Sequence, residues 1–536
     1  MLSGSAGAAR ISSADRWTFL TAGVLLALVG VVCVTFRDYG ITHDEFVQHT
    51  YGELLWNFYL SGFQDRHVFD YIDLFRYGGL FDLVATALAP HLPFDHYETR
   101  HLLSALSGIL GIAGTGCVAA RLAGARAGCI ATVMLALTAS YYGSMFNNTK
   151  DIPFAAGMIW TLYYAIRLID DLPRPRWSSV FAFGTAFGLT IGVRVGVMMI
   201  PAYLVAGMAI WAWGDARQMG ATAARRTIWV ALIRLMPGAL LAYAIMAVCW
   251  PWGVLEPLNP LRALAFFSHH PAVIPSQIFG IHATSAHTLW YYIPGYLLVK
   301  LPELTLIAFA LGLVVIGQRA IRAPNGLRAQ LLVLIMAAVV PLVLFVVFHP
   351  TVFNGLRHFF FVVPPITVVA ALALDEVWKR ASQRGRLWTA GLAVVLALVW
   401  SGQVRVIVAL HPDQYVYYNS IVGGAAGAQD RFEMDYWSNS IREAALKLTD
   451  RVRAETGGKA PARPYKVALC SEYPSFFEYV PPGWFEVADN WTEGDFFVAP
   501  TQMGCDRALD GDLMFVVERM GARLSVVKDR RRILRH

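Results

Sequence analysis

Charged residues are scarce in this chain of 536 residues: only 15% are Asp, Glu, Lys or Arg, whereas 56% are hydrophobic. A soluble domain carries roughly 25% charged residues, so the composition predicts an α-helical polytopic membrane protein. The net charge of +7 does not indicate a nucleic-acid partner, because most of the basic residues lie in short connections between apolar runs. We expect no cleavable signal peptide, since the first apolar run is long and lacks a small-residue cleavage site.

Cysteine is scarce as well. None of the six cysteines stands in a Cys-x-x-Cys spacing, which argues against a zinc site built on cysteines. Cys470 and Cys505 are the two outside the apolar region. In an oxidising compartment they can form a disulfide, whose loop closure is worth roughly 3–4 kcal/mol; two buried free thiols are the alternative. The other four lie in or beside apolar runs and are expected to pack as small hydrophobic residues: Cys33, Cys117, Cys129 and Cys249.

Eleven apolar runs are long enough to be membrane-spanning helices, which need about 20 residues. No internal repeat or low-complexity tract interrupts them. The predicted spans are 17–36, 101–120, 127–146, 152–169, 177–193, 195–213, 228–250, 302–317, 329–348, 359–376 and 388–408.

The connections between these runs are of two kinds. One set is short, rich in Arg and Lys and nearly free of acids, and by the positive-inside rule it is cytoplasmic. The other set includes the long segments 37–100 and 251–301, which are rich in His, Tyr and Phe. This alternation predicts a cytoplasmic N-terminus and an extracytoplasmic C-terminus. Any chemistry is therefore expected on the outer face.

The chain divides into two predicted domains. Residues 1–410 form the transmembrane domain with its long outer loops. Residues 411–536 have the composition of a soluble domain and suffice for a small α/β fold with its own core. Residues 440–454 have the pattern of an amphipathic helix. Short apolar runs between Pro, Gly and Asp predict strands at 465–470, 484–487, 495–498 and 513–517.

Two adjacent carboxylates, Asp44 and Glu45, follow the first apolar run by a few residues. Neighbouring carboxylates raise each other's pKa, and one of them can then accept a proton from a substrate hydroxyl as a general base. The alternative is that they only mark the helix exit. His43 beside them is expected to be a surface or hydrogen-bonding histidine.

A second group of polar residues, Asn147-Asn148-Thr149-Lys150-Asp151, lies in a short connection between two predicted spans. Lys150 is a candidate to bind an anionic substrate, or else a lipid phosphate. Asp151 followed by Pro153 indicates a helix start with Asp151 as the N-cap, a structural role that is compatible with a functional one.

A third group consists of Arg194, Lys300, Arg357 and His358, all predicted at the outer ends of helices. The positive-inside rule disfavours cations there, and ionisable residues within membrane segments are functional candidates by default. A pocket for a lipid-linked phosphate needs such donors, and Arg supplies a bidentate one. The alternative is that these side chains extend to lipid headgroups.

Taken in order, these motifs resemble the GT-C membrane glycosyltransferases. The likeness rests on Thr42-His43-Asp44-Glu45, Asn148-Thr149-Lys150-Asp151-Ile152-Pro153, Gly192-Val193-Arg194 and Asn354-Gly355-Leu356-Arg357-His358. It is strongest to bacterial members of glycosyltransferase family 39, the protein O-mannosyltransferase and aminoarabinose-transferase-like group, and it covers most of residues 15–410. The tail segments 414–419 and 432–437 look like those of bacterial relatives.

The resemblance implies an inverting transfer of a hexose or pentose from a polyprenyl-phosphate donor to a hydroxyl acceptor. Asp44 corresponds to the family's base. Lys150, Arg194, Lys300 and Arg357 are the candidates to hold the phosphate. The implied location is the periplasmic face of the bacterial inner membrane. No cofactor is certain; a divalent metal ion held by Asp44 with Asp151 is a weaker alternative.

The acceptor is a lipid, a glycan or a protein, and the sequence does not choose among them. Unlike the eukaryotic protein O-mannosyltransferases, this chain has no large domain inserted between its helices, which removes any direct argument for a protein acceptor. The competing class is a transporter or flippase for a lipid-linked or anionic solute. Long outer loops with acids, an appended outer domain and the lack of inverted repeats count against it. A non-catalytic scaffold is a third possibility; it would tolerate loss of Asp44, Arg194 and Arg357 together.

Overall fold

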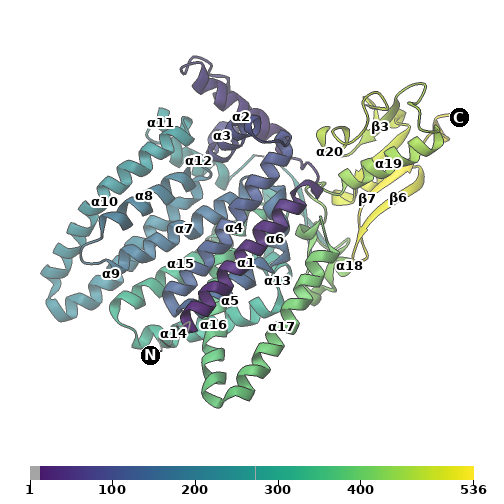
Figure 1. The fold of residues 1–536 in the computed structure, drawn as a ribbon. Coiled ribbons are helices and arrows are strands. Elements are labelled where there is room, and N and C mark those ends of the chain that lie inside the picture. The colour runs from purple at the N-terminus through teal and green to yellow at the C-terminus, as the bar shows by residue number, and fades with distance from the viewer. Residues whose placement is uncertain (1–12, 272, 536) are drawn as a thin grey trace, which may run out of the picture.

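The computed structural model describes residues 13–271 and 273–535. It is a body of long helices with a small sheet domain at one end (Figure 1). The predicted cytoplasmic N-terminal residues 1–12 lie outside the described part. Within that part, nine helices are long and apolar enough to cross a membrane. The prediction of an α-helical polytopic membrane protein with a small C-terminal α/β domain is confirmed.

All eleven predicted spans are helical. The long helices are α1 (Ser13–Thr35), α4 (His96–Ala123), α7 (Asp151–Asp170), α9 (Met199–Met219), α10 (Ala221–Cys249), α14 (Glu303–Arg322), α15 (Asn325–Phe348), α16 (Val363–Arg384) and α17 (Arg386–Ala409). The span predicted at 177–193 is the shorter helix α8 (Trp177–Ile191).

The span predicted at 127–146 is broken into α5 (Ala125–Ala136) and α6 (Ala139–Asn147), which are bent by 64°. Thr138 at the break has an extended backbone, with ψ of 94°. Its hydroxyl donates to the carbonyl oxygen of Met134 at 2.9 Å, so a side chain satisfies a backbone acceptor where the helix is interrupted. As a result α6 leaves the axis of α5 and leads directly into the connection that carries Lys150.

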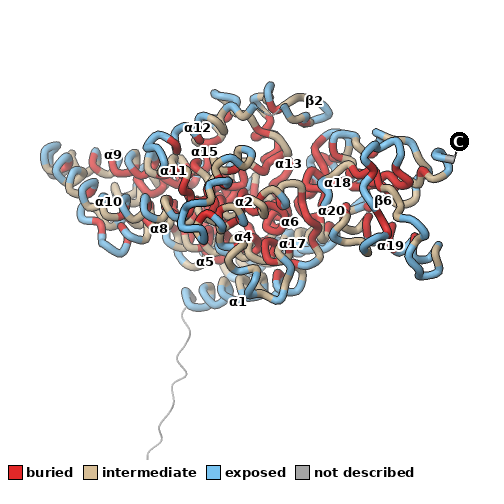
Figure 2. The backbone as a smooth tube through the Cα atoms, turned by 90° about the horizontal axis from the view of Figure 1, so that it is seen from above, coloured by how far each residue is buried: buried red, intermediate tan, exposed pale blue. Residues whose placement is uncertain are grey.

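Helix α16 is the centre of the bundle. Its most apolar window is 89% buried, whereas that of α17 is only 6% buried. Seen from above, buried stretches concentrate in the middle of the helical body and again in the C-terminal domain (Figure 2). The exposed apolar surfaces of α1, α10 and α17 are those that lipid tails would cover.

The two long connections contain short elements that cover one end of the bundle. The first holds α2 (Glu45–Leu60) and α3 (Leu80–Leu88). The second holds α11 (Trp252–Leu255), α12 (Asn259–Ser268), α13 (Tyr292–Lys300) and an antiparallel hairpin of β1 (Pro275–Ile278) and β2 (Ile281–Thr284), which the sequence did not predict. The two connections meet at the helix ends, where the NH of Gly79 donates to the carbonyl oxygen of Cys249 at 2.9 Å.

The C-terminal domain is a five-stranded sheet of order β4-β3-β5-β7-β6. Strands β3 (Tyr465–Leu469), β4 (Phe485–Val487) and β5 (Phe496–Pro500) are parallel. Strand β7 (Ala522–Asp529) pairs antiparallel with β5 on one side and with β6 (Asp512–Arg519) on the other. Helix α19 (Ile441–Glu455) packs its buried face, including Leu448 and Val452, on this sheet. The remaining short helices are α18 (Gly424–Ala428) and α20 (Pro474–Phe477). A disulfide joins Cys470 and Cys505, whose Cα atoms are 6.5 Å apart.

Candidate active site

The loop that enters α2 carries the adjacent carboxylates. The NH of Thr42 donates to Glu45 Oε2 at 2.8 Å, and this bond closes a short turn at the start of the helix. The hydroxyl of Thr42 donates to the carbonyl oxygen of Asn147 at 2.8 Å. The loop with Asp44 is therefore tied to the connection that carries Lys150 and Asp151, although about a hundred residues separate them in the chain.

Asp44 and Glu45 point to different surroundings. Glu45 is buried and its carboxylate lies 3.0 Å from His101 Nε2 on α4. The Asp44 side chain is 37% exposed and accepts a hydrogen bond from Arg357 Nη2 at 2.8 Å. Consecutive residues of a helix start project about 100° apart, which explains the separation. Of the two carboxylates, Asp44 is the one that an external molecule can contact.

The connection 147–151 is capped by Asn148. Its Oδ1 accepts from the backbone NH of Lys150 at 2.8 Å and of Asp151 at 2.7 Å. The predicted N-cap role of Asp151 is therefore wrong: Lys150 occupies the N-cap position and Asp151 is the first helical residue. Because Asn148 satisfies the helix start, the Asp151 carboxylate is available for other partners.

Two arginines share that carboxylate. Arg194 Nη2 lies 2.7 Å from Asp151 Oδ1, and Arg357 Nε lies 3.5 Å from Asp151 Oδ2. Since Arg357 also binds Asp44, the four residues form a chain of alternating charge, Asp44–Arg357–Asp151–Arg194. They come from the α2 loop, the 3-10 helix η7 (Arg357–Val362), the start of α7 and the N-cap of the 3-10 helix η5 (Val195–Met198), three residues after the end of α8.

Lys150 is the unsatisfied cation of this site. It is 3% exposed, and its Nζ has no hydrogen-bond partner among the described residues. The ammonium lies 4.0 Å from the ring centre of Tyr77, which provides a cation–π contact. Burial lowers the pKa of Lys150 to about 8, against the opposing effect of Asp82. A buried donor without an acceptor is costly, so the geometry favours an anionic ligand here.

Tyr77 is brought to the site by close backbone packing. A Cβ on Gly78 would lie 2.1 Å from the backbone of Gly192, so only glycine allows this approach. The NH of Leu80 donates to the carbonyl oxygen of Gly192 at 2.9 Å, which fixes the first outer loop beside Arg194. The Tyr77 ring thereby lies between Lys150 and Arg194, the latter 5.7 Å from its centre.

The charge of Asp44 depends on its cationic neighbours. Burial raises the pKa of Asp44, but Arg357 and Lys150 outweigh burial, and the pKa is lowered from its ordinary value. The carboxylate is therefore ionised at neutral pH and able to accept a proton. Beside Asp44, a hydrogen bond of 2.7 Å joins His43 Nε2 to the hydroxyl of Ser438.

Lys300 and His358 have different surroundings. Lys300 Nζ donates to the carbonyl oxygen of Tyr415 at 3.0 Å and lies 3.6 Å from the Tyr418 ring centre. No hydrogen bond or ion pair among the described residues joins Lys300 to Asp44, Asp151, Arg194 or Arg357. His358 follows Arg357 directly and packs edge-on against Phe353, with the ring centres 4.8 Å apart.

The alternative of a metal held by Asp44 and Asp151 meets an obstacle in the geometry. Both carboxylates bind Arg357, which puts a guanidinium between them. Among the described residues, no group of three or more His, Cys, Asp or Glu side chains is arranged to hold a metal ion. The donor set, as arranged here, does not fit a divalent cation.

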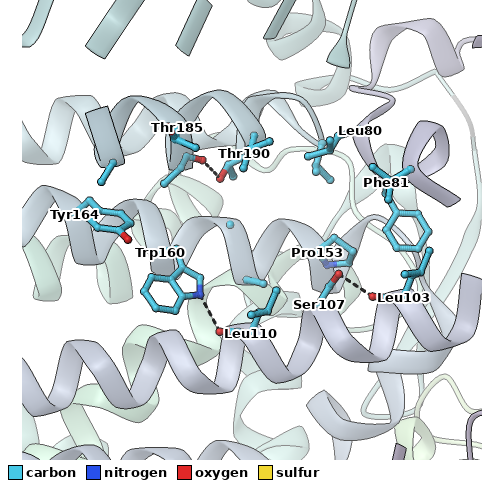
Figure 3. Close-up of a pocket in the computed structure, with 17 residues that line it drawn as sticks. Leu80, Phe81, Leu103, Ser107, Leu110, Pro153, Trp160, Tyr164, Thr185 and Thr190 are labelled. Carbon is cyan, nitrogen blue, oxygen red and sulfur yellow. Dashed lines mark hydrogen bonds between the residues drawn. The ribbon is translucent and has the colours of Figure 1, made fainter. Parts of the chain in front are cut away.

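An apolar cavity of about 660 Å³ lies beside this charged network, between α3, α4, α7 and α8 (Figure 3). Leu110, Trp160, Leu189 and other apolar residues line it. Leu110 and Leu189 are also exposed on the helix surface, so the cavity is open toward the lipid. At its other end are Pro153 and Val193, two and one residues from Asp151 and Arg194 respectively.

Sequence reasoning missed several contributors. Tyr77 lies in a loop with many aromatic residues, and nothing in the sequence distinguishes it from its neighbours. Asn148 lies in the polar connection that the sequence singled out, but the sequence pattern predicted Asp151 as the residue that caps α7. The ring centre of Trp437 lies 4.3 Å from the Arg357 guanidinium. The resemblance of segment 432–437 to the tails of bacterial relatives was the one sequence signal that pointed to this tryptophan.

Comparison with known proteins places these observations in a class. Residues 95–252, from α4 to the start of α11, match the model of the dolichyl-phosphate-mannose-protein mannosyltransferase family. For this segment, the match confirms the resemblance to the protein O-mannosyltransferase group that the motifs indicated. The segment contains Lys150, Asp151 and Arg194 but neither Asp44 nor Arg357. No curated protein sequence matches the chain.

Solved structures with a related arrangement include ArnT from Cupriavidus metallidurans in the apo state, with TM-score 0.47, 16% identity, and coverage of 96% of this chain and 98% of that one. The same protein bound to undecaprenyl phosphate has TM-score 0.49 and 15% identity, with equal coverage. The oligosaccharyltransferase from Archaeoglobus fulgidus in the apo form has TM-score 0.47 and 14% identity, and covers 90% of this chain and 69% of its own.

Proposed function

We propose that this protein is an inverting glycosyltransferase that moves a sugar from a polyprenyl-phosphate donor to a hydroxyl acceptor. The observation that carries the proposal is the combination at one place of an accessible carboxylate, Asp44, an unpartnered buried ammonium, Lys150, and a lipid-open apolar cavity. A lipid-linked sugar has three matching parts: an apolar chain, an anionic phosphate and an electrophilic sugar carbon.

The cavity accounts for the lipid chain. Its lining is predominantly apolar, and it extends from the exposed surface of α4 and α8 to Pro153 and Val193 beside the charged network. A polyprenyl chain lying in it would bring its phosphate to the starts of α7 and of the segment after α8. Lys150, at the N-terminal end of α7, is then an unsatisfied donor available to that phosphate.

The proposed reaction is a displacement at the anomeric carbon. The acceptor oxygen attacks that carbon, the bond from the carbon to the phosphate oxygen breaks, and the phosphate leaves with the electron pair. Asp44 takes the proton of the acceptor hydroxyl, a step that contributes typically 10²–10⁴-fold. A single displacement inverts the configuration at the carbon.

Charge stabilisation comes from the cations around the network. Lys150 and Arg194 are placed to neutralise the negative charge that grows on the leaving phosphate. Arg357 bonds to Asp44 and keeps it ionised, so that the carboxylate is ready at neutral pH. Glu45 is given a supporting role, since it is buried against His101 and closes the turn at Thr42.

The proposed location is the periplasmic face of the bacterial inner membrane, with the N-terminus in the cytoplasm. The support is the distribution of charge: the helix ends and connections opposite the site carry arginines, such as Arg225 and Arg226 near the start of α10. The C-terminal domain would then be periplasmic, where a disulfide between Cys470 and Cys505 is stable.

The test is release of polyprenyl phosphate from a polyprenyl-phosphate hexose or pentose by the purified protein. We expect D44N to lose transfer by at least about 100-fold while it still inserts in the membrane. E45Q is the matched control, because it changes the neighbouring carboxylate and retains hydrogen-bonding capacity toward His101. Near-normal turnover in D44N together with loss in E45Q would show that the base is wrongly assigned.

A further inference from the structure

A segment just before α19 crosses from the C-terminal domain onto the candidate active site. Three consecutive residues of this crossing segment, Trp437, Ser438 and Asn439, are each almost fully buried. Each contacts a different part of the site: Arg357, His43 and the backbone of Gly40. Consecutive residues with separate partners in the same site indicate more than general packing.

Asn439 joins the two loops that carry the charged residues. Its Oδ1 accepts from the NH of Gly40 at 2.7 Å and from the Asn147 amide at 3.0 Å. Gly40 precedes Asp44 by four residues, and Asn147 precedes Lys150 by three. One amide oxygen therefore sets the distance between the loop of the proposed base and the loop of the proposed phosphate ligand.

The contact at Gly40 leaves no room for a side chain. A Cβ on Gly40 would lie 2.4 Å from the carbonyl oxygen of Asn439 and 3.1 Å from Cβ of Arg442. Glycine at this position is thus explained by the approach of the crossing segment. At the next residue, the NH of Ile41 donates to the hydroxyl of Tyr479 at 3.0 Å. The C-terminal domain therefore binds two successive residues of the loop, Gly40 and Ile41.

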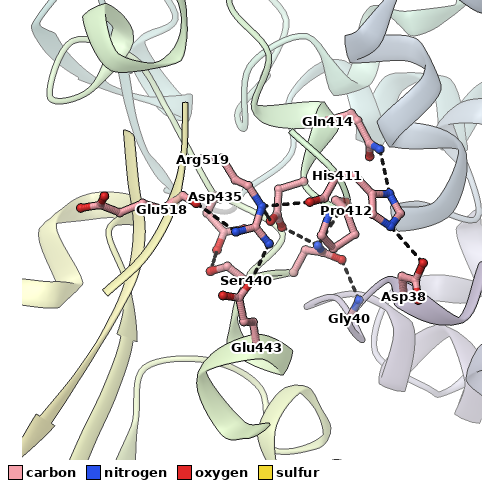
Figure 4. A network of polar contacts seen from close by, with 12 residues as sticks. Asp38, Gly40, His411, Pro412, Gln414, Asp435, Ser440, Glu443, Glu518 and Arg519 are labelled. Carbon is pink, nitrogen blue, oxygen red and sulfur yellow. Dashed lines mark hydrogen bonds and ion pairs between the residues drawn. The ribbon is translucent and has the colours of Figure 1, made fainter. Parts of the chain in front are cut away.

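The C-terminal domain in turn fixes Asn439 through a polar network that includes Arg519 and Glu443, which Figure 4 shows. The Asn439 amide donates to Asp413 Oδ1 at 2.5 Å. Asp413 is fully buried and its Oδ2 lies 3.0 Å from Arg519 Nε, at the end of β6. Arg519 also contacts Glu443 on α19 at 2.5 Å. The position of Asn439 is therefore determined by the sheet domain.

Trp437 supports Arg357 with the face of its ring. The indole ring is 1% exposed, and its centre lies 4.3 Å from the Arg357 guanidinium. Arginine on the face of tryptophan is a favourable cation–π arrangement. The guanidinium is thereby held by an aromatic ring and by its two carboxylate partners, Asp44 and Asp151.

We propose that Trp437, Ser438 and Asn439 are positioning residues of the transfer site, through which the C-terminal domain sets the placement of Asp44 and Arg357. This inference rests on the proposed function and extends it: the small domain is part of the catalytic unit. None of the three residues needs to touch the substrate, because each acts through a residue of the site.

The first experiment separates the aromatic face of Trp437 from its volume. We expect W437L to lower kcat by about 10–100-fold, the range that follows from misplacing a reacting group. W437F keeps a ring face for Arg357 and should retain most of the activity. Equal losses in W437F and W437L would overturn the proposal for Trp437.

A pH profile distinguishes positioning from general destabilisation. In W437L, Arg357 is no longer held at Asp44, so the acid limb of kcat/KM should move to higher pH by about one unit, while W437F keeps the wild-type limb. An unshifted limb in W437L contradicts the role given to Trp437. The charged and titratable groups that face Asp44 are Arg357, Lys150, His43, Asp151, Tyr77 and Glu472.

The second experiment concerns the bridge at Asn439. N439A should lower kcat by about tenfold or more, because it releases the loop of Asp44. The KM for the lipid donor should rise as well, because the same amide holds the loop of Lys150 through Asn147. G40A should act in the same direction, since its methyl group forces the loop away from Asn439. A normal kcat in N439A, or a loss confined to KM, refutes the bridge.

The matched control is W491L, which removes a partly exposed tryptophan of the same domain away from the site. Activity in W491L shows that the domain tolerates loss of a tryptophan. D44N assayed in parallel separates the two proposals. If D44N is inactive and both W437L and N439A are normal, the positioning role fails and the proposed function stands; an active D44N defeats the proposed function itself.

Discussion

Raising the pH should weaken binding of the lipid donor through a single residue, Lys150. Its ammonium is buried, has no hydrogen-bond partner among the described residues, and has a pKa of about 8 because of burial. The phosphodiester of a polyprenyl-phosphate sugar keeps one negative charge throughout the neutral and mildly alkaline range. The pH dependence therefore comes from the lysine, which binds the donor only in its charged form.

The size of the effect follows from the pKa. At pH 7, one unit below it, about nine-tenths of Lys150 is charged; at pH 9 only about one-tenth is. The KM for the donor should therefore rise about tenfold between pH 7 and pH 9. Proton transfer to Asp44 should not contribute, because the pKa of Asp44 is lowered from its ordinary value and the carboxylate is ionised across this range.

The assay is the initial rate of polyprenyl-phosphate release at a series of donor concentrations, at half-unit steps of pH. K150R tests the assignment, because arginine stays charged and its KM should be nearly constant from pH 7 to pH 9. K447R, at an exposed lysine on α19, is the matched control and should keep the wild-type profile. A wild-type KM that does not change with pH, or an equal rise in K150R, would refute the role given to Lys150.

Three further predictions concern the cavity, the buried ion pair and the disulfide. A182W places an indole in the apolar cavity and should raise the KM for a long-chain donor more than for a short-chain analogue. L240W, on the lipid-facing side of α10, should raise neither KM. Equal effects of A182W on the two donors would argue against the cavity as the site of the lipid chain. R519Q leaves the buried Asp413 without its guanidinium partner and should lower the stability of the C-terminal domain by about 3–5 kcal/mol, measured by thermal unfolding. The double variant D413N/R519Q should lose less stability, because no unpaired charge remains buried. An equal loss of stability in the two variants would contradict this account. C470S and C505S should each lower the free energy of unfolding by roughly 3–4 kcal/mol, and the double variant should lose the same amount. Additive losses in the double variant would show that the two thiols act separately.

The spans could be predicted because a membrane helix is defined locally, by about 20 consecutive apolar residues. The break at Thr138 could not, since the segment 125–147 contains no proline and its apolar pattern continues through the bend. Strand β7 was missed for a related reason. Its sequence ARLSVVKD alternates too many polar residues for a central strand, and its position between β5 and β6 is what buries it.

The candidate site was predicted only in part because its residues are selected by distant partners. Asp44 stood out through its place after the first span, and Arg357 through a cation on the disfavoured side. Lys300 carried the same signal, but its ammonium is held by the carbonyl oxygen of Tyr415, more than a hundred residues away. A cation near an outer helix end is thus compatible both with a phosphate site and with a backbone contact, and only the fold distinguishes them.

The pair of carboxylates shows how far a local motif determines function. Sequence reasoning treated Asp44 and Glu45 together, on the argument that neighbouring carboxylates raise each other's pKa. In the structure each has its own partner on a different element: Glu45 faces His101 inside the bundle, and Asp44 faces Arg357 near the surface. The turn at Thr42 makes this division possible, because Glu45 is turned back to cap the loop while Asp44 is turned outward. Adjacent acids at a helix start therefore have different roles: Glu45 holds the loop, and Asp44 is available to the acceptor.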